Sequence, residues 1–148
     1  MKIEVIYSTR TGNTERIAEA IAGELGTTAK RVSEVGPLDE VDLLFVGRGL
    51  YGWNVDPVAR KFVHSLNSAM VKRVAVFGTA STYAGNRRVT KQMQQLLRHQ
   101  DLAVSDETYS CKARMWFFNR GKPDEDHLKR AADLARTAAK EAGPRTRK

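Results

Sequence analysis

The stretch YSTRTGNTERIAEAI, residues Tyr7 to Ile21, decides how the chain is expected to fold. Its first residue, Tyr7, completes a pattern with Ile3, Val5 and Ile6 that predicts a strand, and the stretch ends in apolar residues at helical spacing. The residues between strand and helix are unusually rich in hydroxyl and amide side chains: Ser8, Thr9, Thr11, Asn13 and Thr14. One such residue is enough to cap a helix, so the excess favours a socket for an anion.

A helix N-terminus suits a phosphate, because its first backbone N–H groups lack partners and its dipole is positive there. Gly12 lets the backbone lie close to such a group. The segment has neither the Lys-Ser/Thr pair of a P-loop nor the Gly-x-Gly-x-x-Gly of a dinucleotide turn. Hydroxyls and amides suit a monoester that stays bound. The alternative is that Asn13 or Thr14 only caps the helix.

The rest of the chain alternates between short apolar runs and longer helical patterns. Residues 43–47 and 74–78 are continuous apolar runs, as expected of strands covered on both faces. Shorter or less regular strand patterns occur at residues 29–32 and 102–111, and the final helical pattern follows Pro123. Five strands alternating with four helices predict an α/β fold: an open parallel sheet with helices on both faces.

Ligands of such sheets bind outside the carboxyl ends of the strands, where the strand order reverses. This rule selects three loops: Ser8 to Thr14, Arg48 to Asp56, and Thr79 to Asn86. The second loop contains Tyr51 and Trp53, which could flank a flat ring or merely close the edge of the core. The hydroxyl groups of the third loop could equally serve ordinary turns.

The motif from Ser8 to Thr14, directly after a first strand, resembles the FMN phosphate loop of the flavodoxin family, Ser/Thr-x-Thr-Gly-Asn-Thr. The resemblance implies a flavodoxin-like five-stranded fold and one FMN-binding domain over residues 1–142. Residues 143–148 are expected to form a disordered basic tail. The cofactor-binding residues that it implies are Ser8, Thr9, Arg10, Thr11, Gly12, Asn13, Thr14, Gly49, Leu50, Tyr51, Gly52, Trp53, Thr79, Ala80, Ser81, Tyr83, Gly85 and Asn86.

The resemblance also implies separate roles for the aromatic residues. Tyr51 looks like one wall of the isoalloxazine, and Tyr83 is a candidate for the opposite wall. Gly52 matches the glycine whose peptide turns when the flavin is protonated, a movement that glycine tolerates. Trp53 departs from the family, which often has an acid there, and it could cover the ring or dock a partner. A further patch, Trp116 to Phe118, is expected to pack in the core, and the alternative is that it lines the cofactor mouth or a partner surface.

The length, composition and charge of the chain limit the classes of protein to which it can belong. The 148 residues suit one domain, and no apolar run is long enough to span a bilayer. With a single cysteine, Cys111, and no recognisable signal peptide, the cytoplasm is the expected location. No catalytic acid–base pair or metal cluster is expected, because His64, His99 and His127 lie far apart on predicted helices. The net charge of +8 either reflects only a solvated face or favours an acidic partner, an anionic membrane surface or nucleic acid. Redox partners with an acidic docking surface are expected, because no nucleic-acid motif is present.

The leading hypothesis is a flavodoxin-like electron carrier, in which FMN supplies the redox chemistry between two partner proteins. The alternative is a flavodoxin-type FMN enzyme, such as a protoporphyrinogen oxidase or a quinone reductase. A phospho-receiver on the same fold is excluded, because Tyr7-Ser8 and Gly47-Arg48 stand where its acids are needed.

Overall fold

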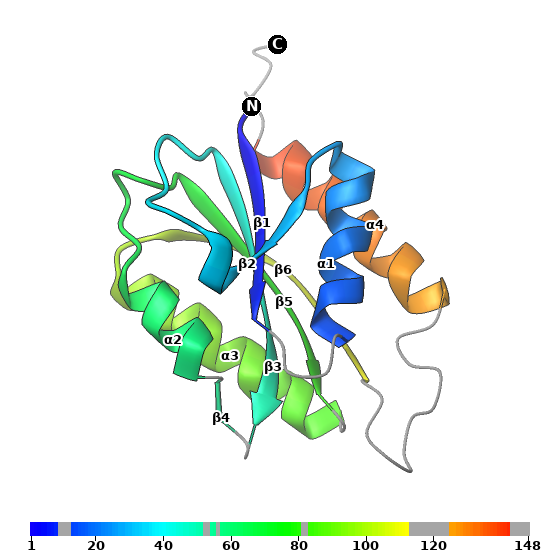
Figure 1. The fold of residues 1–148 in the computed structure, drawn as a ribbon. Helices are drawn as coiled ribbons and strands as arrows, with labels where there is room; N and C mark the ends of the chain where they lie inside the picture. Colours follow the sequence, from blue (N-terminus) through cyan, green and yellow to red (C-terminus); the bar gives the residue numbers. More distant parts are fainter. Residues whose placement is uncertain (9–12, 52–53, 56, 81–82, 113–124, 143–148) are drawn as a thin grey trace.

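The structure is a computed structural model that describes residues 1–8, 13–51, 54–55, 57–80, 83–112 and 125–142. These residues form six strands, four α-helices and one short 3-10 helix (Figure 1). In chain order they are β1 Ile3–Ser8, α1 Asn13–Leu25, β2 Ala29–Arg31, η1 Val32–Glu34, β3 Leu43–Tyr51, β4 Asn54–Val55, α2 Pro57–His64, β5 Arg73–Ala80, α3 Tyr83–His99, β6 Ala103–Lys112 and α4 Glu125–Ala142. The alternating pattern predicted from the sequence is confirmed.

Five of these strands form a parallel sheet in the order β2-β1-β3-β5-β6. The chain leaves β1 for β2 on one side and then crosses to β3 on the other, so the order reverses between β1 and β3. At this reversal the strands are in register near their carboxyl ends, with Ser8 opposite Arg48 and Arg48 opposite Gly78. The predicted open parallel sheet is therefore confirmed, and its switch point lies beside Ser8.

Two helical layers cover the sheet (Figure 1). Helices α1 and α4 pack against each other on one face, while α2 and α3 cover the other. Alternate residues of the central strand β3 serve the two cores: Leu43 and Phe45 face α1 and α4, and Leu44 and Val46 face α2 and α3. All four are fully buried, which explains why this strand is a continuous apolar run.

Gly47 makes room for a neighbouring aromatic ring. It lies in β3 directly opposite Phe77 of β5, and Phe77 is fully buried. A Cβ atom built on Gly47 would overlap the Phe77 ring carbons. The close approach of β3 to this ring therefore requires glycine at position 47.

Several predicted boundaries were wrong. The expected loop from Arg48 to Asp56 begins as strand, because β3 continues to Tyr51 and pairs with the antiparallel strand β4 through Leu50 and Val55. The expected loop from Thr79 to Asn86 is also largely regular: Thr79 and Ala80 end β5, and Tyr83 to Asn86 begin α3. The apolar runs marked only part of each strand, whereas the backbone pairing extends farther.

Other local features concern the end of α1, the end of β2 and the pairing of β6. Gly26 follows α1 with a φ of 70°, a conformation that favours glycine and ends the helix. The predicted second strand stops at Arg31, since Val32 already begins η1. The last strand, β6, whose pattern is less regular in the sequence, shifts register in its pairing with β5 between Val74 and Val76. Pro123 lies outside the described residues.

Candidate functional site at the carboxyl edge of the sheet

The structure brings the described parts of all three predicted segments to one edge of the sheet. Ser8 ends β1 and Asn13 begins α1; Gly49 to Tyr51 end β3; Thr79 and Ala80 end β5. The pairing of Gly49 with Thr79 keeps the ends of β3 and β5 level. Tyr83, Gly85 and Asn86 lie in the first turn of α3. The predicted residues outside the described part of the chain are Thr9, Arg10, Thr11, Gly12, Gly52, Trp53 and Ser81.

The junction of β1 and α1 carries two buried hydroxyl groups. Ser8 is 9% exposed and Thr14 is 0% exposed, and they are the first and last residues of the predicted phosphate loop. Thr14 lies in the first turn of α1, whose backbone N–H groups and dipole make this end of the helix positive. The junction thus combines polar side chains with a helix terminus that attracts anions.

A polar cluster lies directly beside this junction. The hydroxyl of Tyr7 donates a hydrogen bond of 2.7 Å to Oε1 of Glu15, which lies in the first turn of α1. Arg31, at the end of β2, donates from Nη2 to Oε2 of Glu15 at 3.4 Å. The guanidinium carbon of Arg31 also lies 5.8 Å from the centroid of the Tyr7 ring. The cluster therefore connects β1, α1 and β2 through one carboxylate.

Sequence reasoning missed this cluster. The acid at position 15 was visible in the first turn of the predicted helix, where it suits the helix dipole. Its pairing with Arg31 depends on the parallel register of β1 and β2, in which Tyr7 lies opposite Arg31. No spacing along the chain contains that information.

Tyr7 is 4% exposed, and its surroundings disfavour the phenolate. Burial raises the pKa of its hydroxyl from the ordinary 10.0 to about 12, and the hydrogen bond and negative charge of Glu15 act in the same direction. The positive charge of Arg31 partly opposes this rise in the pKa. The cluster therefore holds Tyr7 neutral, as a hydrogen-bond donor, throughout the ordinary pH range.

Because the pKa of Tyr7 is raised, the free energy of unfolding should depend on pH in the alkaline range. A hydroxyl with a higher pKa in the folded state stabilises the fold fully below about pH 10 and loses this contribution as the pH approaches 12. We expect the stability gap between the wild type and Tyr7→Phe to narrow by about 1 kcal/mol between about pH 9 and pH 11. Urea denaturation of both proteins across this range measures the gap. A gap that stays constant would show that Tyr7 titrates normally.

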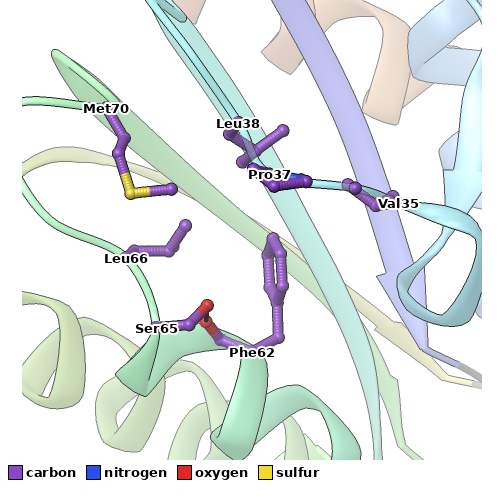
Figure 2. A pocket seen from close by; sticks show the side chains of 8 residues that line it. Val35, Pro37, Leu38, Phe62, Ser65, Leu66 and Met70 are labelled. Carbon is purple, nitrogen blue, oxygen red and sulfur yellow. Dashed lines mark hydrogen bonds between the residues drawn. The ribbon is translucent and has the colours of Figure 1, made fainter.

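A separate pocket lies against the opposite helical layer (Figure 2). It has a volume of about 330 Å³ and lies between the segment after η1 and the end of α2. Its lining residues are Val35, Gly36, Pro37, Leu38, Phe62, Ser65, Leu66 and Met70. None of the predicted cofactor-binding residues contributes to it. A mainly apolar hollow of this size has few polar groups to orient a ligand.

The described residues contain no group of three or more His, Cys, Asp and Glu side chains that could hold a metal ion. The three histidines lie on helices as predicted, His64 and His99 at the ends of α2 and α3 and His127 in α4. Among the described helices, none is both long and apolar enough to cross a membrane.

Comparison with known proteins gives a consistent match. The family model of the flavodoxin domain matches residues 4–106. An uncharacterised protein of Methanocaldococcus jannaschii is 26% identical over 151 residues, which cover 95% of this chain and 99% of the relative. The matched family segment contains both the β1–α1 junction and the ends of β3 and β5.

Solved structures show the same fold. A flavodoxin from the domain Archaea aligns with a TM-score of 0.79 and 20% identity, covering 96% of this chain and 99% of the other. A short-chain flavodoxin associated with a non-canonical PDU bacterial microcompartment aligns with a TM-score of 0.78 and 18% identity, covering 97% and 100%. In both cases the similarity extends over nearly the full length of the two chains.

Proposed function

Because the chain belongs to the flavodoxin family, we propose that it binds FMN at the carboxyl edge of β1, β3 and β5 and carries electrons between redox partner proteins. The observation that carries this proposal is the β1–α1 junction. There the buried hydroxyls of Ser8 and Thr14 flank the positive end of a helix, at the point where the strand order reverses.

The residues at this edge fit the cofactor chemically. The backbone N–H groups of the first turn of α1 and the hydroxyls of Ser8 and Thr14 would hold the phosphate monoester. The remaining residues of the segment from Ser8 to Thr14 belong to the same proposed phosphate site. Residues 49–53, 79–81, 83 and 85–86 would enclose the flavin ring, with Tyr51 and Tyr83 as candidate walls. FMN would supply the redox chemistry, while the chain binds and orients it.

The net positive charge of the chain supports a proposal about its partner proteins. A net charge of +8 attracts proteins with an acidic surface and speeds their association at low ionic strength. We propose electron donors and acceptors whose docking surfaces are acidic. A single FMN-binding domain over residues 1–142 and a cytoplasmic location belong to the same proposal.

FMN binding is tested directly by calorimetry and by denaturation. We expect FMN to bind the chain freed of cofactor and, at about 100 times its Kd, to raise the free energy of unfolding by about 3 kcal/mol. Riboflavin, which lacks the phosphate, should bind more weakly because it leaves the β1–α1 junction without its anion. Absence of both heat and stabilisation on adding FMN would end the proposal.

Electron transfer needs its own assay with the FMN-loaded chain. We expect reduction of a redox partner protein, with a rate that falls as salt screens the attraction between basic and acidic surfaces. Protoporphyrinogen and quinones serve as comparison substrates. Rapid turnover of either compound, without electron transfer to a partner protein, would show that the chain is an enzyme and not an electron carrier.

A further inference from the structure

The cluster of Tyr7, Glu15 and Arg31 places two opposite charges next to the proposed phosphate site. Glu15 directly follows the buried Thr14 in the first turn of α1. Its two carboxylate oxygens have different partners, since Oε1 accepts from the Tyr7 hydroxyl at 2.7 Å and Oε2 accepts from Arg31 at 3.4 Å. Tyr7 is almost completely buried, so its hydroxyl fixes the position of the carboxylate.

This arrangement poses an electrostatic problem for an anion at the same helix end. A carboxylate in the first turn of α1 benefits from the helix dipole, but it repels a phosphate that uses the same dipole. Arg31 offsets this repulsion because its positive charge contacts the carboxylate directly. Both side chains remain partly exposed, so each can be replaced without opening the core.

We infer that the Glu15–Arg31 pair sets how strongly the β1–α1 junction binds a phosphate, and thereby how well it distinguishes FMN from riboflavin. The inference rests on the proposed FMN function and adds two residues to it. Neither residue needs to touch the phosphate. They are positioning residues, which act through the local charge at the start of α1.

We expect removal of either charge alone to shift the affinity for FMN, in opposite directions, and removal of both charges to cancel these shifts. Glu15→Gln keeps an oxygen that can accept from Tyr7 but removes the negative charge, so FMN should bind more tightly. Arg31→Gln leaves Glu15 unbalanced, so FMN should bind more weakly. A unit charge at a distance of about 10 Å from a dianion in water changes its affinity about fourfold. The double variant restores neutrality and should return to roughly the wild-type affinity.

Calorimetric titration of the wild type, the two single variants and the double variant with FMN and with riboflavin measures these affinities. Because riboflavin carries no phosphate, its affinity should stay within about twofold of the wild type in every variant. The differences in FMN affinity should also disappear at about 1 M salt, where the screening length falls to about 3 Å. Both readouts separate an effect of charge from a change in local structure.

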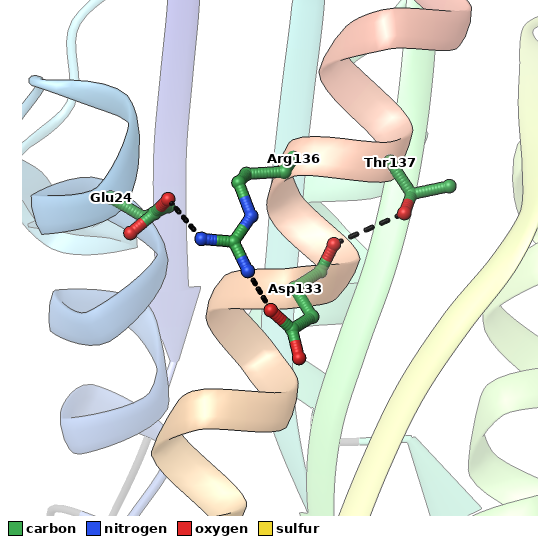
Figure 3. A network of polar contacts seen from close by, with 4 residues as sticks. All are labelled: Glu24, Asp133, Arg136 and Thr137. Atoms are coloured by element: carbon green, nitrogen blue, oxygen red, sulfur yellow. Dashed lines mark hydrogen bonds and ion pairs between the residues drawn. The ribbon is translucent and has the colours of Figure 1, made fainter.

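A second ion pair on the same helix supplies matched controls (Figure 3). Near the other end of α1, Glu24 accepts from Nη1 of Arg136 in α4 at 2.8 Å. Arg136 also contacts Asp133, one turn away in α4. Glu24→Gln and Arg136→Gln make the same charge changes far from the β1–α1 junction. Neither should alter the affinity ratio of FMN to riboflavin.

The outcomes separate this inference from the proposed function. If the wild type binds no FMN, the proposed function fails and the inference falls with it. If the wild type binds FMN but Glu15→Gln and Arg31→Gln leave the ratio unchanged, only the inference is overturned. It is also overturned if both variants change FMN and riboflavin affinity equally, or if the Glu24 and Arg136 variants shift the ratio as much. Opposite, salt-sensitive shifts with a near-neutral double variant support it.

Discussion

Thr14→Val is expected to weaken FMN binding by about 10-fold to 100-fold and to leave riboflavin binding nearly unchanged. Thr14 is fully buried at the start of α1, where the proposed phosphate site lies. A hydrogen bond to a charged group contributes about 1.5–3 kcal/mol, which corresponds to this change in Kd. Valine has nearly the same shape as threonine but lacks the hydroxyl, so the variant removes the donor with little change in packing.

Thr90→Val is the matched control for Thr14→Val. Thr90 is 8% exposed and lies within α3, well beyond the first turn that contains Tyr83. Its replacement should change stability but not the FMN affinity. Parallel calorimetric titrations of the two variants compare them directly. If Thr14→Val reduces the affinities for FMN and riboflavin by the same factor, Thr14 acts through the structure of the junction rather than on the phosphate.

Gly47→Ala is expected to destabilise the folded chain by about 3 kcal/mol. The added methyl group would overlap the ring of Phe77, and Phe77 is enclosed in the core between the sheet and the α1–α4 layer. Overpacking of this kind forces side chains or backbone to move and costs about 1–3 kcal/mol or more. Urea denaturation measures the loss, which should appear as a lower midpoint with a similar slope.

Two further substitutions show whether the ring causes this loss. Phe77→Leu shortens the obstructing side chain, so it should offset part of the cost of Gly47→Ala and give a coupling of about 1 kcal/mol or more. Gly23→Ala is the control, because nothing lies within 4 Å of its added carbon and alanine favours the helix. Wild-type stability in Gly47→Ala would mean that β3 and Phe77 pack differently.

The fold was largely predictable from the sequence because burial follows hydrophobic pattern. The run from Leu43 to Gly47 indicated a central strand, and the structure has β3 in the middle of the sheet. The ends of β3 and β5 were not predictable in the same way. Gly49 to Tyr51 and Thr79 to Ala80 belong to the strands through backbone pairing, and backbone pairing leaves little trace in side-chain polarity.

The position of the candidate site could be predicted from the sequence, but one of its side-chain contacts could not. The concentration of small polar residues from Ser8 to Thr14 pointed to the β1–α1 junction, and the topology then placed the ends of β3 and β5 beside it. The Glu15–Arg31 pair could not be predicted, because Arg31 reaches Glu15 only after β2 has paired with β1. Contacts that depend on strand order require the folded chain.

The packing of α4 against α1 has a consequence for the order of events during synthesis. Ile17, Ala18 and Ile21 of α1 share one core with Ala131, Ala135 and Ala138 of α4. A nascent chain that has emerged only as far as β6 therefore leaves this side of its first helix uncovered, although every strand that the structure describes is already made. The ribosome must therefore deliver residues 125–142 before α1 is packed on this side, so the core around the first helix is completed only after α4 has been made.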